Sequence, residues 1–515
     1  MLGVTLRSLL ALLLITASAN LAFGAATPQL PRSEHKPQPT IEEQLELIGA
    51  RMMEGDVESA LSEGAALLQR PEFKASSDDF RYRALLALGM LEAHAGSAKQ
   101  GQAYLDEAAT ISPDRLDAGY WQLYAVVAKE NKNHDGAAVA MTEVARQNPK
   151  LLAQWEGRFA FGILRNARKS SPPEIYHELA GTLWTAGFDL DGDFISLDPI
   201  WIDLLENYIS EGRPDDAAAV ADGLRDANSL AALSYDLRLS DYARADVYQA
   251  YRDARQAEIV DGKALVDEHP RDASKVMRVA SELADFNRLD EGLALLDGAI
   301  GRADAALGKP ALDDEEDYLA WLHNTRARIL MKLGRWEEAI TAQTKSRDIS
   351  NSYQPGEVSQ SVNLGDFYYV LGEADKALEA VAQIDTGTAS AFGMSAIKEV
   401  EACAYHQNGD AAKSSAAVEF LVANVDVNFQ AAKLALLCVG DVDRLAGIVI
   451  SRLEDPGTRR EMLSDLQVYM PPPARPEITV RMDELYAGLS MRKDVKAALE
   501  TTGRILQWPA FRAGT

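Results

Sequence analysis

The chain has 515 residues, of which 47% are hydrophobic and 25% charged, and its formal net charge at pH 7 is −26. The chain is longer than the chains that fold around a single hydrophobic core, so it either divides into several domains or extends its core along one axis. The strong negative charge repels phosphate backbones and argues against nucleic acid as a partner.

Residues 1–25 have the pattern of a secretory signal peptide. Arg7 precedes an apolar run over 8–23, and small residues follow at candidate cleavage sites. The alternative is an uncleaved membrane anchor, but the run is shorter than the roughly 20 residues that a spanning helix needs. Residues 26–40 are proline-rich and are predicted to be a linker. We expect a secreted protein, most simply in a bacterial periplasm, with no stable membrane span after signal cleavage.

After this linker, one arrangement of small and large residues recurs about every 34 to 38 residues. Small residues at the eighth and twentieth positions of each copy let two helices approach closely. A glycine near the fifteenth position permits the positive backbone φ that ends the first helix. The clearest copies are marked by Leu88, Gly89, Gly96, Gly101, Leu105, Ala108 and Pro113; by Trp201, Leu204, Tyr208, Gly212 and Ala217; by Ala327, Gly334, Ala339 and Lys345; and by Leu364, Gly365, Tyr368, Gly372 and Ala377.

These markers resemble those of the tetratricopeptide repeat (TPR), a family of helix-turn-helix repeats. The resemblance implies an all-α fold, namely a right-handed α-solenoid of about 11–13 TPR-like helix pairs. In such an array each pair buries its apolar face only against its neighbours, so the core grows with the chain. No alternating pattern typical of a β-strand was found at any length.

The first half of the array contains regular repeats and degenerate repeats that have lost some of the marker residues. Residues 41–150 are predicted to form N-terminal TPR-like repeats, with Lys132 in place of one turn glycine. Residues 151–275 are predicted to be degenerate helical repeats, in which 151–168 forms a helix that Ser-Ser-Pro-Pro ends. Within them, residues 237–270 fit a helix pair by length but lack the turn glycine.

The second half is predicted to be more regular. Residues 276–460 form C-terminal TPR-like repeats, in which Asn287 takes a left-handed turn position. Residues 461–515 contain a proline-rich break and a terminal helix pair. Cys403 and Cys438 fall in the first helices of consecutive repeats. A disulfide is one interpretation, and two small buried hydrophobic side chains is the one that we favour.

No motif in the sequence carries known catalytic chemistry. None of the seven histidines lies three or four residues from another, so no helical metal pair is predicted. The sequence also lacks a nucleophile elbow, a phosphate-cradling glycine loop and a zinc-protease motif. We therefore expect a protein that is not an enzyme and needs no cofactor.

An acidic insert over 188–198 is the strongest metal candidate. Asp189, Asp191 and Asp193 alternate along it and offer oxygen ligands to Ca²⁺. The spacing differs from a calcium helix-loop-helix, because glycine stands at the fourth position and isoleucine at the twelfth. The alternative is a solvated acidic loop.

TPR proteins often bind peptides in the concave groove lined by their first helices. The resemblance assigns Asn324, Arg328, Asn363 and Asp366 to the positions that grip a C-terminal carboxylate in one such mode. Asp366 would repel a carboxylate, so that mode is not expected here. The candidate groove residues are Arg328, Lys332, Asn363 and Tyr369. The alternative is that these are ordinary solvent-facing polar positions with no role in binding.

The function that we predict is a non-catalytic periplasmic TPR scaffold that mediates interaction with a protein or peptide. The alternative is an accessory factor for cell-envelope or exopolysaccharide assembly or secretion. A polysaccharide binder should line its groove with aromatic residues, and only 7% of this chain is aromatic. A third class, an enzyme with an unrecognised site, would need a buried carboxylate pair with shifted pKa values.

Overall fold

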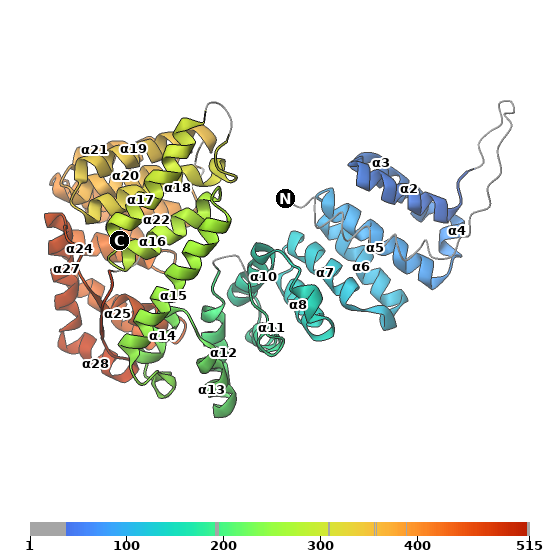
Figure 1. Ribbon diagram of the computed structural model, residues 1–515, viewed down its shortest axis with the longest axis horizontal. Coiled ribbons are helices and arrows are strands. Elements are labelled where there is room, and N and C mark those ends of the chain that lie inside the picture. Colours follow the sequence, from blue (N-terminus) through green and yellow to red (C-terminus); the bar gives the residue numbers. More distant parts are fainter. Residues whose placement is uncertain are drawn as a thin grey trace. The chain divides into compact units, whose positions relative to one another are not determined.

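A computed structural model describes residues 38–190, 195–306, 310–354, 356, 358–387 and 389–511. The predicted signal peptide and most of the linker lie outside these residues. The structure divides into two compact units, and their boundary falls between Asn207 and Tyr208. Among the described residues, no helix is both long enough and apolar enough to cross a membrane. Each unit is a succession of helix pairs (Figure 1).

The N-terminal unit consists of helices that pack mainly against their neighbours in sequence. Its elements are α2 (Ile41–Glu54), α3 (Val57–Gln69), α4 (Pro71–Lys74), α5 (Asp78–His94), α6 (Ala98–Ile111), η1 (Pro113–Arg115), α7 (Ala118–Glu130), α8 (His134–Gln147), α9 (Pro149–Leu152), α10 (Gly157–Ser170), α11 (Pro173–Thr185) and most of α12 (Asp198–Ser210).

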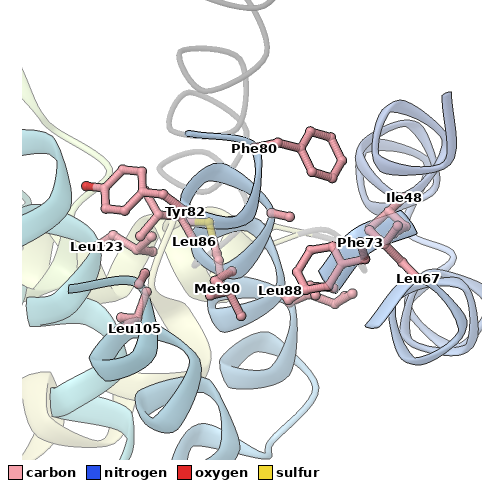
Figure 2. Packing of buried hydrophobic residues seen from close by; sticks show 14 of the residues in the cluster. Ile48, Leu67, Phe73, Phe80, Tyr82, Leu86, Leu88, Met90, Leu105 and Leu123 are labelled. Carbon is pink, nitrogen blue, oxygen red and sulfur yellow. The ribbon is translucent and has the colours of Figure 1, made fainter. Parts of the chain in front are cut away.

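Apolar residues of successive helices interlock to form the core of this unit. The cluster in Figure 2 joins α2 and α3 to α5, α6 and α7 through buried side chains such as Ile48, Leu67, Met90, Leu105 and Leu123. Phe73 of the short helix α4 meets Phe80 of α5 edge to face, with ring centroids 6.2 Å apart. Each layer thus contacts the next, as the repeat pattern predicts.

The C-terminal unit contains longer helices and two very short strands. Its elements are α13 (Pro214–Gly223), α14 (Ala227–Tyr235), η2 (Ser240–Tyr242), α15 (Val247–Glu268), α16 (Ala273–Asp285), α17 (Leu289–Ala305), α18 (Glu315–Lys332), α19 (Trp336–Tyr353), α20 (Ser359–Val370), α21 (Ala374–Ala382), α22 (Ala391–Gln407), α23 (Ala411–Ala423), α24 (Phe429–Val439), α25 (Val442–Glu454), α26 (Arg459–Asp465), β1 (Val468–Tyr469), α27 (Glu477–Ser490), α28 (Lys493–Thr502) and β2 (Gln507–Trp508).

One turn joins the two helices of nearly every pair. One or two residues after the first helix, a residue takes a positive φ, and the next amide donates to a carbonyl five residues back, as Ser97 N does to Glu92 O at 2.8 Å. This hydrogen bond closes the helix end. Lys132 and Asn287 hold the same position with φ of 56° and 60°. The two substitutions for glycine predicted from the sequence are therefore confirmed.

Small residues allow close helix contact within a pair, as predicted. A Cβ atom on Gly101 of α6 would lie 2.5 Å from the carbonyl oxygen of Gly89 in α5. Such a contact is too short for any side chain, so the α5–α6 approach depends on glycine. The turns, the close contacts and the helix content confirm an all-α, TPR-like helical-repeat fold.

The region 237–270 differs from its prediction. The structure has one 22-residue helix there, α15, preceded by the single turn η2, where the sequence was expected to form a helix pair. No residue between Val247 and Glu268 takes a positive φ, because the missing turn glycine leaves nothing to interrupt the helix. The prediction of a pair at this position was wrong.

Candidate functional site

The last described residues, 503–511, return to the C-terminal unit in an extended form, and we call them the tail. The tail follows α28, and its last residue, Phe511, bonds to Asp285 at the end of α16. It pairs with two separate segments. Its first residues pair antiparallel with the end of α14, through a bridge between Asp236 and Gly503. Further along, β2 pairs in parallel with β1, so that Tyr469 opposes Trp508.

Main-chain hydrogen bonds hold the tail along most of its length. Leu237 N donates to Thr502 O at 3.1 Å, and Arg504 N donates to Tyr235 O at 2.9 Å. Beyond them, Val468 N donates to Leu506 O, Met470 N to Ala510 O, and Phe511 N to the carbonyl oxygen of Asp285, each at 2.8–3.1 Å. Such bonds recognise an extended backbone regardless of its side chains.

One buried glutamine links the tail to the segment before β1. The side-chain oxygen of Gln467 accepts from Leu506 N at 2.9 Å and from the indole nitrogen of Trp508 at 3.3 Å. Its amide nitrogen donates to Arg504 O at 3.1 Å and to Leu463 O at 2.7 Å. Gln467 is almost completely buried, so its polar groups depend on the tail being in place.

Three side chains anchor the tail. Trp508 is fully buried, and its ring lies 4.8 Å and 5.6 Å from the rings of Tyr251 and Tyr248 of α15. Phe511 is buried, with the ammonium of Lys332 at 5.9 Å from its ring centroid. Arg504 donates from Nε to Ser234 O, near the C-terminal end of α14, at 2.6 Å. A cation suits that end of a helix, where carbonyl groups lack helical partners.

A row of buried and half-buried polar side chains runs along the first helices of the C-terminal unit, and we call it the polar seam. Lys332 of α18 pairs with Asp285 of α16 at 3.1 Å. Arg328 of α18 donates to Asn324 on its own helix at 3.3 Å and to Asn363 of α20 at 3.5 Å. The seam therefore joins α16, α18 and α20 through polar contacts.

The seam continues through carboxyl groups whose pKa values are raised. Burial raises the pKa of Asp366 to about 7, against the opposing influence of Arg328. Oδ1 of Asp366 has no hydrogen-bond donor among the described residues. Burial also raises the pKa of Glu399 well above its usual range, with a further contribution from Asp366. Glu399 accepts the hydroxyl hydrogen of Tyr369 at 2.7 Å, so the phenol compensates part of this cost.

The two ends of the seam are fully paired. Lys433 of α24 donates to Asp465 of α26 at 2.7 Å, and Tyr486 of α27 donates to the other oxygen of that carboxylate. At the opposite end, Arg255 of α15 donates to Glu282 of α16 at 2.6 Å and to Glu258 at 2.9 Å. Buried charges of this kind cost stability unless both partners remain in place.

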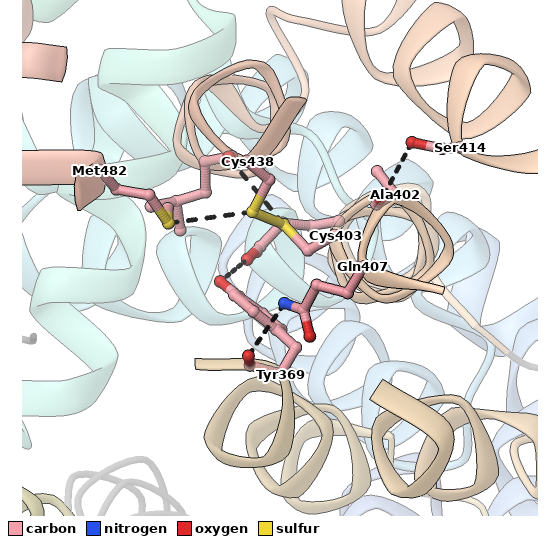
Figure 3. The surroundings of a disulfide bond; sticks show 9 residues. Tyr369, Ala402, Cys403, Gln407, Ser414, Cys438 and Met482 are labelled. Carbon is pink, nitrogen blue, oxygen red and sulfur yellow. Dashed lines mark hydrogen bonds between the residues drawn. A yellow bond between two sulfur atoms is a disulfide. The ribbon is translucent and has the colours of Figure 1, made fainter. Parts of the chain in front are cut away.

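A disulfide between Cys403 and Cys438 ties α22 to α24, with the two Cα atoms 5.3 Å apart (Figure 3). The sequence analysis favoured two unbridged cysteines, and that preference was wrong. The repeat register brings the two first helices side by side, and both side chains lie at the contact. Around the bridge, Gln407 donates to the carbonyl oxygen of Tyr369 at 3.0 Å, and Sδ of Met482 lies 3.8 Å from Cys438 Sγ.

No protein-family model and no curated protein matches this sequence. Among solved structures, one of Naa15/Naa10 bound to HypK-THB contains a chain that is 12% identical to this one. That match covers 89% of this chain and 90% of the other, with a TM-score of 0.27. The similarity at this TM-score is too low to support any conclusion about this chain.

The four candidate groove residues all lie in the polar seam. The structure brings Arg328 and Asn363 together, pairs Lys332 with Asp285, and pairs Tyr369 with Glu399. Tyr369 and Lys332 are buried, so little of either side chain is exposed to a partner. Whether a partner contacts these residues stays a prediction.

The calcium candidate is only partly within the described residues. Asp191 and Asp193 lie outside them, and Asp189 accepts a hydrogen bond from the neighbouring amide of Leu190 at 2.8 Å. Across the part of the chain that the structure describes, no three histidine, cysteine, aspartate or glutamate side chains are grouped as metal ligands.

Sequence reasoning missed the tail. The prediction for this region was a terminal helix pair that Trp508 and Pro509 close. The only local signal is the combination of Trp508, Pro509 and Phe511 after the last helix, which places two large apolar rings on a segment too short to bury them itself.

Proposed function

We propose that this chain is a non-catalytic scaffold of the TPR type that binds extended segments of partner proteins in an exported compartment. The observation that carries the proposal is the tail. The C-terminal unit holds nine residues of extended chain by main-chain hydrogen bonds to the end of α14, to the segment around β1 and to α16, and by ring anchors on α15. A surface that holds one extended segment has the chemistry needed to hold others.

The repeat fold supports the same proposal. Each helix pair contacts its neighbours, and the faces that they do not cover form a surface that lengthens with every repeat. A partner on such a surface contacts residues from many helices at once, which suits recognition of a long segment.

Two features support the exported location. The first 25 residues have a signal-peptide pattern, although they lie outside the described residues. Cys403 and Cys438 are bridged, and disulfides persist mainly in oxidising compartments such as the periplasm. The bridge links two helices inside one unit, as a structural disulfide does.

Co-purification tests the binding role. The full chain with a C-terminal tag, crosslinked in cells and purified from the periplasmic fraction, should enrich specific proteins above an untagged strain. The matched control is a tagged, unrelated periplasmic protein of similar charge. Recovery of the same proteins with both baits would contradict the scaffold role, and recovery only from the cytoplasm with free thiols would contradict the location.

A further inference from the structure

We infer that the tail is a tethered ligand, and that its binding surface also accepts a segment of a different protein with the same chemistry. The surface, which we call the tail site, consists of residues 234–237, Tyr248, Tyr251, Asp285, Lys332 and 467–470. The partner segment is extended and has an arginine, a tryptophan four residues later and a phenylalanine three residues after that. This inference rests on the proposed scaffold function and names the class of partner.

The bonding pattern is that of a bound peptide. The tail has no helix, and its amides and carbonyls bond to α14, to α16 and to the segment around β1, all distant in sequence. The hydrogen bond from Arg504 of the tail to Ser234 O joins residues that are 270 positions apart in the sequence. The tail thus adds a strand to β1, which is the same main-chain pairing that peptide-binding domains use.

The side chains of the tail also divide as those of a ligand do. Trp508 and Phe511 are buried against α15 and α18, whereas Gln507 and Arg504 are exposed, although Nε of Arg504 donates to Ser234 O. A few aromatic and arginine anchors carry most of the affinity in peptide interfaces. The spacing from Arg504 to Trp508 to Phe511 is therefore the recognisable feature of a competing segment.

The tail is connected to the C-terminal unit through α28, and the disulfide between Cys403 and Cys438 ties α22 to α24 rather than the tail. Attachment through a short tether gives the tail an effective concentration on the order of millimolar at its site. A partner must displace the tail, so the wild-type chain should bind free peptides weakly. Only segments that make additional contacts elsewhere on the scaffold should release the tail from the tail site.

The charge of the chain favours such a partner. The net charge is −26, and the arginine of the segment meets the carbonyl groups at the end of α14. A basic residue in an incoming segment is thus attracted both by the whole chain and by this helix end.

The test uses a fluorescent synthetic peptide with the sequence of residues 502–511 and the full chain in three forms. These are the wild type, Trp508→Ala, and the control Phe392→Ala, which removes a ring that is 60% exposed in the same unit. In fluorescence anisotropy, W508A should bind the peptide with a micromolar Kd. The wild type and F392A should bind at least roughly 30-fold more weakly, because their own tail occupies the site.

Two further probes test the chemistry of recognition. A peptide in which alanine replaces tryptophan should bind W508A roughly 30-fold more weakly than the native peptide. A peptide that keeps only arginine, tryptophan, proline, phenylalanine and the glycine at position 503, where a Cβ would lie 2.6 Å from the carbonyl oxygen of Tyr235, with serine elsewhere, should bind within about tenfold of the native peptide. Equal binding of the alanine peptide, or no binding of the serine peptide, would overturn the proposed partner chemistry.

Folding and self-association are controlled separately. If W508A has lost helix content by circular dichroism, addition of the native peptide should restore its melting temperature, and failure to restore it would overturn the inference.

R504A retains the buried anchors, and its affinity for the peptide should lie between those of the wild type and W508A. An affinity no higher than that of the wild type would count against a tethered ligand. A wild-type dimer held by exchanged tails, seen in sedimentation, would assign the site to a second copy and overturn the foreign partner.

This experiment is independent of the co-purification test. Peptide binding by W508A without any co-purified protein would leave the tethered ligand standing and remove the scaffold role. Co-purified proteins without peptide binding by a folded W508A would keep the scaffold and overturn the tail site.

Discussion

The two units of this protein share one helical-repeat pattern, but different kinds of internal contact stabilise each unit. In the N-terminal unit, contacts join neighbouring layers, as when Tyr82 donates to Arg115 O across 33 residues. In the C-terminal unit, the tail joins Arg504 to Ser234 across 270 residues, and a disulfide ties α22 to α24. The first unit is therefore a stack whose stability sums over neighbours, and the second is closed by the tail.

This difference separates two sources of stability, namely contacts between neighbouring layers and contacts between segments that are distant in sequence. A stack tolerates a local defect, because only adjacent layers lose contacts. A unit closed by a tail couples α14, α15, α16 and the β1 segment, so that loss of one anchor affects helices that are distant in sequence. The predictions below test that difference from the largest effect to the smallest.

Removing the indole of the tail should have the largest effect. Trp508→Ala is expected to destabilise the C-terminal unit by about 3–5 kcal/mol, because it deletes a fully buried ring and leaves Gln467 without one donor. Hydrogen exchange followed by mass spectrometry should show faster exchange in α14–α16 and no change in α5–α8. Equal loss of protection in both units would remove the distinction between them.

Removing the disulfide should also act on one unit. Cys403→Ala with Cys438→Ala is expected to cost roughly 2–4 kcal/mol, because the bridge closes a loop between residues 35 apart. Urea unfolding of the C-terminal unit should shift to lower concentration, and dithiothreitol should produce the same shift in the wild type. An unchanged midpoint after reduction would show that the bridge is dispensable.

Acid should weaken the C-terminal unit through His323. Burial lowers the pKa of this imidazole from 6.5 to about 4, and its Nε2 has no hydrogen-bond partner among the described residues. Below pH 6.5 the unfolded chain binds the proton more tightly than the folded one. Stability is therefore lost as the pH falls from about 6.5 to 4, by about 3 kcal/mol.

The matched variants for this pH effect are His323→Leu and His269→Gln. The first removes the buried imidazole, and the second changes an exposed one. Urea midpoints measured at pH 7 and pH 4.5 should differ less in H323L than in the wild type and H269Q. The same pH dependence in all three chains would assign the acid sensitivity to other groups.

The smallest effect concerns the turns. Lys132→Gly should stabilise the N-terminal unit by about 0.5–1 kcal/mol, because lysine holds a left-handed φ of 56° that glycine adopts without strain. Asn287→Gly should gain less, since asparagine tolerates this conformation. Thermal unfolding of the two variants checks the ranking, and a destabilised K132G would mean that the lysine side chain contributes more than its backbone costs.

Much of the fold could be predicted because its determinants are local. A positive φ after each first helix needs only glycine or a tolerant substitute at one position, so Lys132 and Asn287 were placed correctly from their register. The close contact between Gly89 and Gly101 follows from the same spacing. Helix pairs repeat these rules, and the copies support one another.

The candidate site could be predicted only in part. Register placed Arg328 and Asn363 on adjacent first helices, where the structure finds them in contact. It could not show that Lys332 and Tyr369 are buried with partners, because that depends on neighbours outside their own repeats. The tail was missed since two-residue strands leave no periodic pattern, and pairing across 270 residues leaves no local one.

Native-state hydrogen exchange of the tail itself tests most directly whether it closes the C-terminal unit. The amides of Arg504, Leu506 and Phe511 donate to α14, to Gln467 and to α16. They should exchange as slowly as the amides in the middle of α15 and lose that protection together with them in urea. Exchange of these three amides at the rate of an unstructured peptide, while α15 remains protected, would contradict the account.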